Sequence, residues 1–125
     1  IDRDLLIKNL DGDEALASEA IAAYVDAVTS ATPSGKRASF AHHTRADYLF
    51  AERGDQQPRS LAPAFFVPVA GDDLIGGSIA ALEGHAAALT RAYGPCADAT
   101  ATMNVRAGSG SLDEIVRFAS DASDS

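Results

Sequence analysis

Residues 74–106, LIGGSIAALEGHAAALTRAYGPCADATATMNVR, combine a helical pattern with a strand pattern that follows it directly. Apolar residues recur at three- and four-residue spacing over residues 74–93, and Gly94-Pro95 ends this predicted helix. Over residues 99–106 apolar and polar side chains alternate, which is typical of a half-buried strand. The buried stripe of the helix is expected at Ile79, Leu82, Ala86 and Leu89.

Ahead of this segment the sequence predicts one more helix and one more strand. Residues 11–14, DGDE, have the form of a helix start with an acidic cap, and Pro33 with Gly35 ends the helix. Residues 46–51, ADYLFA, predict a short strand with aromatic character. The buried stripe of this first helix is expected at Leu16, Ala20, Ala23, Tyr24, Ala27 and Val28, widened by Ile21 and Val25.

Two further segments complete the pattern. Residues 61–69 are apolar but carry Pro63 and Pro68, which leaves an irregular segment or an edge strand. Residues 111–114, SLDE, form a second capping box and lead a short helix, and residues 120–125 are expected to fray. With no repeat and no separate linker, the chain is expected to form one α+β or α/β domain.

Composition excludes several classes of protein. The chain has 125 residues, a formal charge of -8 and 46% hydrophobic residues, typical of a globular rather than a disordered chain. No apolar run approaches the roughly 18 residues that cross a bilayer, so no membrane partner is expected. Cys96 is the single cysteine, which favours a reducing cytoplasm. The first residue is Ile1 rather than Met, as in a piece of a longer protein.

The charge is unevenly distributed along the chain. Residues 36–59 hold five basic and three acidic residues, a local charge of +2 that leaves -10 for the remainder. Ser39, Phe40 and His42-His43 lie within this basic run, and such a mixture can contact phosphates and stack on bases. Net charge therefore does not exclude nucleic acid. The alternative is a solvated loop whose arginines pair with neighbouring acidic helices.

No motif indicates catalysis or metal binding. His42-His43 have no acidic or histidine partner at ligand spacing, and His85 has no neighbour that marks it as a base. The chain lacks a G-x-S-x-G elbow. Residues 108–110, GSG, resemble a phosphate-cradling turn, but without the lysine of a P-loop an ordinary turn is favoured. We therefore expect no enzyme activity, no cofactor and no metal.

An ordered series of motifs is similar to one known family. The motifs, in chain order, are Arg3-Asp4-Leu5-Leu6, Asn9-Leu10-Asp11-Gly12, Pro33-Ser34-Gly35-Lys36, Ser39-Phe40-Ala41, Gln57-Pro58-Arg59-Ser60-Leu61-Ala62, Ala64-Phe65 and Tyr93-Gly94. Over nearly the whole chain they resemble the C-terminal part of the CasC/Cse-type backbone subunits, the Cas-seven family, of the type I-E CRISPR Cascade complex.

The resemblance implies a fold and a function. It implies an α+β, partial RNA-recognition-motif-like (ferredoxin-like) palm, with residues 1–125 as the C-terminal part of one palm domain and Ile1–Asp4 as the end of a strand. It implies a CRISPR-associated, non-catalytic protein that coats CRISPR RNA (crRNA) for antiviral defence. The implied partners are crRNA, other copies of the subunit, other Cascade subunits and, indirectly, target DNA.

The family resemblance and the local charge together indicate five candidate RNA-binding residues. The resemblance places the segment around Lys36 near the guide backbone and implies Lys36, with Ser39 as a weaker candidate. Arg37 stands where the family often has Gln. Charge adds Arg37, Arg45 and Arg59 as phosphate contacts.

Two other functions remain open at this point. One is a fragment of a bacterial enzyme domain whose active site upstream sequence completes. The other is a protein-interaction domain that docks a partner through residues 61–69.

Overall fold

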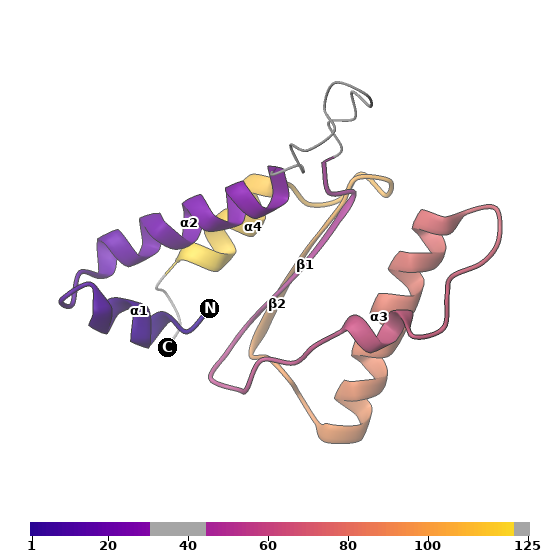
Figure 1. Ribbon diagram of the computed structural model, residues 1–125, viewed down its shortest axis with the longest axis horizontal. Helices are drawn as coiled ribbons and strands as arrows, with labels where there is room; N and C mark the ends of the chain where they lie inside the picture. The colour runs from indigo at the N-terminus through magenta and orange to yellow at the C-terminus, as the bar shows by residue number, and fades with distance from the viewer. Residues whose placement is uncertain (31–44, 122–125) are drawn as a thin grey trace. The chain divides into compact units, whose positions relative to one another are not determined.

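The computed structural model describes residues 1–30 and 45–121 (Figure 1). Among these residues the elements, in chain order, are α1 (Arg3–Asn9), α2 (Glu14–Ser30), β1 (Tyr48–Arg53), the 3₁₀ helix η1 (Ala62–Phe65), α3 (Leu74–Tyr93), β2 (Ala99–Asn104) and α4 (Leu112–Ser120). The two strands form an antiparallel sheet. The predicted α+β class is confirmed, and the sheet is compatible with part of a ferredoxin-like fold.

The chain divides into two compact units. Unit 1 comprises residues 1–51 and 101–125 and contains α1, α2 and α4. Unit 2 comprises residues 52–100 and contains η1 and α3. Strands β1 and β2 contribute residues to both units. The assignment of the chain to part of one palm domain stays a prediction.

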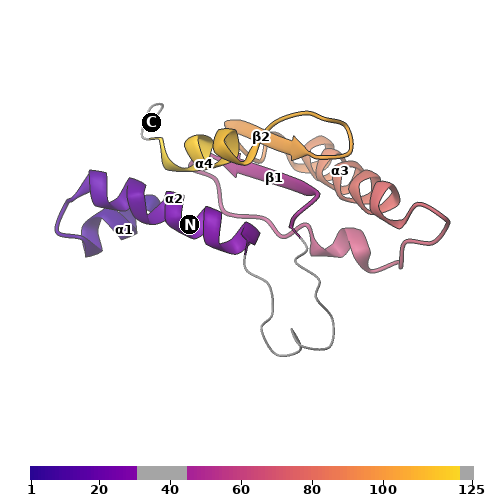
Figure 2. The ribbon, with the colours of Figure 1, turned by 90° about the horizontal axis from the view of Figure 1, so that it is seen from above.

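Unit 1 is built on the contact between α2 and α4, which lie side by side in Figures 1 and 2, and α1 folds back against α2. The buried side chains of these helices are Ala17, Ile21 and Ile115. Arg3 joins the three helices, because its guanidinium donates to Ser18 Oγ at 3.0 Å and to the Ser120 carbonyl at 3.1 Å. Burial of the aliphatic side chains stabilises this unit.

Helix α1 shows that the expected strand at Ile1–Asp4 is wrong. Asp2 accepts a hydrogen bond from the backbone N–H of Leu5 at 2.9 Å and so acts as an N-cap. Asp4 in the first turn and Lys8 in the last turn complement the helix dipole. These local signals favour a helix over the strand that the family resemblance implies.

Helix α2 begins later than the residue pattern suggests. Asp13, rather than Asp11, is hydrogen-bonded as the cap, since its Oδ1 accepts the N–H of Leu16 at 2.9 Å. Asp11 instead has a φ of 55° and, with Gly12 at 87°, makes the turn that follows α1. The helix is described to Ser30, and the expected stop at Pro33 and Gly35 lies outside the described residues.

The predicted buried stripe of α2 is only partly correct, because Ile21 is buried and Val25 half-buried as expected but the other members are exposed. Leu16, Tyr24 and Val28 are 46%, 56% and 58% exposed, whereas Ala17 and Ile21 are buried. Successive residues of an α-helix are about 100° apart, so Tyr24 and Val28 lie in line with this buried pair, whereas the remaining exposed members lie on a flank of the helix. The first two residues of this line are buried, and the later two are exposed.

The sheet closely follows the predicted strands. The N–H of Val105 donates to the Asp47 carbonyl at one end of the ladder, and the N–H of Asp98 donates to the Arg53 carbonyl at the other, each at 2.9 Å. Along β2 the alternation from Ala99 to Met103 is confirmed, with every second residue exposed. The strand nevertheless ends at Asn104, before the predicted Arg106.

Unit 2 consists mainly of α3 with η1 packed on it. The predicted bounds of the long helix, Leu74–Tyr93, are confirmed, with Asp73 as its N-cap. Its expected stripe is buried or half-buried. Residues 62–65 form a 3₁₀ turn, so the irregular alternative is correct for this apolar segment. None of the described helices has both the length and the apolarity needed to cross a membrane.

Helix α4 confirms the second predicted cap. Ser111 Oγ accepts the backbone N–H of Glu114 at 3.2 Å. The helix runs through Ser120, so the expectation that this residue belongs to a frayed tail is wrong. Residues 122–125 lie outside the described residues.

Candidate nucleic-acid interface

The five candidate RNA-binding residues fall into three groups. Lys36, Arg37 and Ser39 lie outside the described residues. Arg45 belongs to unit 1 and lies just before β1, and Arg59 belongs to unit 2 and lies between β1 and η1.

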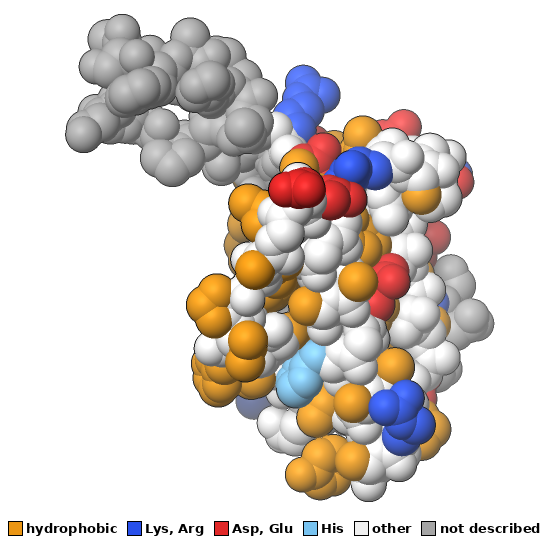
Figure 3. Space-filling model, turned by 90° about the vertical axis from the view of Figure 1, so that its right-hand side faces the viewer, with side chains coloured by type: hydrophobic (Ala, Val, Ile, Leu, Met, Phe, Trp, Pro, Cys, Tyr) orange, Lys and Arg blue, Asp and Glu red, His pale blue; other side chains and the backbone are white. Residues whose placement is uncertain are grey.

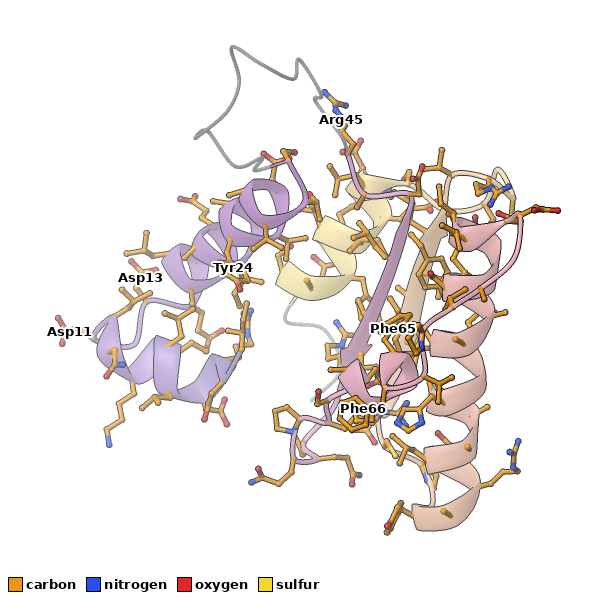
Figure 4. The ribbon with its side chains drawn as sticks, turned by 45° about the vertical axis from the view of Figure 1, so that its right-hand side comes forward. Asp11, Asp13, Tyr24, Arg45, Phe65 and Phe66 are labelled. Carbon is orange, nitrogen blue, oxygen red and sulfur yellow. The ribbon has the colours of Figure 1, made fainter. Side chains whose placement is uncertain are left out.

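Arg45 is exposed, and no described residue forms an ion pair or a side-chain hydrogen bond with it. The backbone two residues away is fixed, because the carbonyl of Asp47 accepts the N–H of Val105, directly after β2. In unit 1, Asp11 and Asp13 lie near the start of α2, and Arg45 lies near its other end (Figure 4). The arginine is therefore well separated from the acidic turn and can approach an anion.

Arg59 has a different environment. Its Nε donates to Glu52 Oε2 at 3.0 Å, and Nη2 pairs with Glu52 Oε1, so the contact is bidentate. Nη1 donates to the Ala86 carbonyl at 3.1 Å and to Thr90 Oγ1 at 3.4 Å. The two charged side chains are only 15% and 19% exposed. All three guanidinium nitrogens therefore have partners within unit 2.

Hydrogen bonding to Glu52 raises the pKa of Arg59 above its ordinary value. The guanidinium is therefore charged under all ordinary conditions and connects β1, the loop before η1 and α3. A phosphate could replace Glu52 only by breaking a bidentate charged pair. Within this arrangement Arg59 holds the loop in place. Its role in RNA binding stays a prediction.

Apolar side chains are exposed around η1. Phe66 and Val67 are 81% and 79% exposed, and Phe65 is 43% exposed. Figure 4 shows the two phenylalanines close together beside α3, and Figure 3, which looks onto the side carrying α3, shows hydrophobic side chains gathered along one flank. Flanking Pro63 and Pro68 signal an interrupted backbone, but the sequence carries no signal that these rings face solvent.

The other chemical candidates do not form a site among the described residues. No three histidine, cysteine or acidic side chains in this part of the chain gather as metal ligands. The thiol of Cys96 is half-buried, with Sγ at 3.4 Å from the Gly94 carbonyl. His42 and His43 lie outside the described residues, and His85 is half-buried on α3.

The glycine turn after β2 is a closed structural turn. The N–H groups of Gly108 and Ser109 donate to the carbonyls of Val105 and Asn104, at 3.2 and 3.1 Å. Backbone amides that already have carbonyl partners cannot also cradle a phosphate. This agrees with the favoured interpretation of an ordinary turn.

Comparison with known proteins adds the family. The comparison with curated proteins gives no match. The model of the CT1975-like protein family, a family of CRISPR-associated (Cas) proteins, matches residues 1–122. That match spans nearly the whole sequence, including both units and the basic segment. The chain therefore belongs to the CT1975-like family of CRISPR-associated proteins.

Proposed function

We propose that this chain is part of a non-catalytic backbone subunit of a type I-E Cascade complex, which binds and coats crRNA. The observation that carries the proposal is the family match over residues 1–122. The ordered motifs that resemble Cas-seven backbone subunits support the finer assignment. The proposed partners are crRNA, neighbouring copies, other Cascade subunits and, indirectly, target DNA, in the cytoplasm.

The proposed chemistry is recognition of the phosphate backbone. A subunit that coats guides of different sequence has to grip phosphate and sugar without reading bases. Lys36, Arg37 and Arg45 supply positive charge for this purpose, and Ser39 supplies a hydroxyl donor. Arg59 acts as a positioning residue, because its donors already hold Glu52 and α3.

The test compares charge reversals inside and outside the basic segment. We would measure the affinity of the 125-residue chain for two unrelated fluorescein-labelled single-stranded RNAs by fluorescence anisotropy. Lys36→Glu and Arg45→Glu are expected to weaken binding about tenfold for both sequences, because each replaces a phosphate contact by repulsion. Arg91→Glu, an exposed reversal on α3, is the matched control and is expected to change affinity less than twofold.

Two results would contradict the proposal. If Arg91→Glu lowered RNA affinity as much as the two reversals in the basic segment, the loss would come from the change in net charge rather than from a local contact. If a charge reversal weakened binding to one RNA sequence much more than to the other, the replaced residue would contact bases. A backbone subunit does not need such contacts.

A second candidate function, a protein-interaction domain, is favoured by the exposure of Phe66 and Val67. Exposed large apolar side chains that lie together commonly mark interaction sites. The double variant Phe66→Asp/Val67→Asp separates the two functions. Loss of a partner subunit in co-purification with unchanged RNA affinity would favour the interaction domain.

A further inference from the structure

We draw no further inference here: the strongest candidate, the exposed apolar patch formed by Phe65, Phe66 and Val67 at the end of η1 in unit 2, is the surface of the second candidate function already described, and nothing in the structure shows what covers it.

Discussion

Arg59 shows how a charged residue that resembles a nucleic-acid contact can serve the fold. Its guanidinium bridges Glu52 of β1 and the carbonyl of Ala86 in α3, across segments that are far apart in sequence. Because the pair is mostly shielded from water, loss of one partner leaves the other charge poorly solvated. The residue therefore belongs first to the stability of unit 2.

Replacing Arg59 by methionine is expected to lower the free energy of unfolding by about 1–2 kcal/mol. The charged hydrogen-bond network is lost, whereas the unbranched methionine side chain still occupies part of the space. Urea unfolding followed by circular dichroism measures this change. Arg91→Met, on the exposed end of α3, is the control and is expected to stay within about 0.5 kcal/mol. Equal effects would mean that the Glu52 pair adds nothing.

The pH dependence of this pair has a defined sign. The folded pKa of Arg59 is raised above its ordinary, strongly basic value, so its stabilising contribution is complete below that ordinary value and is lost only as the pH rises through the raised pKa. The difference between wild type and Arg59→Met is therefore expected to be the same at pH 8 and pH 10. A difference that shrinks over this range would contradict the assigned cause.

Gly110 is the second residue whose role is structural. It has a φ of 70°, and a Cβ at this position would overlap the carbonyl oxygen of Thr102. Gly108 has a similar φ of 65° but open space around it. Gly108→Ala is expected to cost about 1 kcal/mol from backbone strain alone, and Gly110→Ala is expected to cost clearly more. Thermal unfolding of both variants checks the order, and a larger loss at Gly108 would refute it.

At the scale of elements, the buried apolar side chains of unit 1 are few. Ile115 is the buried residue of α4, and Ala17 and Ile21 are those of α2. The same side of α2 also carries Tyr24 and Val28, which are exposed, so burial on this helix is confined to its first half.

Ile115→Ala is expected to lower the free energy of unfolding by about 2–4 kcal/mol, because it removes buried methylene groups and leaves a cavity. Leu16→Ala, on the exposed side of α2, is expected to stay within about 0.5 kcal/mol. Chemical denaturation measures both variants. If Leu16→Ala were the more damaging, α2 would be packed by its other face.

The bounds of the helices and strands were more predictable from the sequence than the side that each helix buries. The bounds of α3 and the cap of α4 follow from local signals, namely periodic apolar residues, Gly94 and Ser111. The buried side of α2 could not be predicted, because alanines surround the helix and local pattern does not distinguish two apolar sides. Of the candidate site, Arg45 is exposed and its phosphate contact stays a prediction, and the partners of Arg59 could not be predicted from spacing.

At the scale of the whole molecule, charge distribution matters more than net charge. The chain carries -8 overall but +2 over residues 36–59. Beyond a Debye length of about 8–10 Å charges are largely screened, so the acidic remainder does not prevent a local basic segment from binding phosphate. The net charge is therefore compatible with the proposed RNA role.

The salt dependence of RNA affinity tests whether the basic segment binds phosphates. If about three basic residues neutralise phosphates of single-stranded RNA, the logarithm of the association constant is expected to fall with the logarithm of salt concentration with a slope of about -2. Arg45→Glu is expected to reduce the size of that slope by about 0.7. Anisotropy titrations over a range of KCl concentrations measure both values. A slope near zero would rule out phosphate binding by this segment.

The amino-acid sequence by itself determined the α+β class, the strands, the long helix and the uneven charge, because these depend on local periodicity, capping and composition. Tertiary structure decided three other features: Arg3 ties α1 to α2 and α4, α2 exposes most of its expected core stripe, and Arg59 pairs with Glu52 and with the Ala86 carbonyl of α3. Each of these depends on contacts between separate elements of the fold. Such contacts select among locally equivalent faces and partners, and local pattern does not contain that choice.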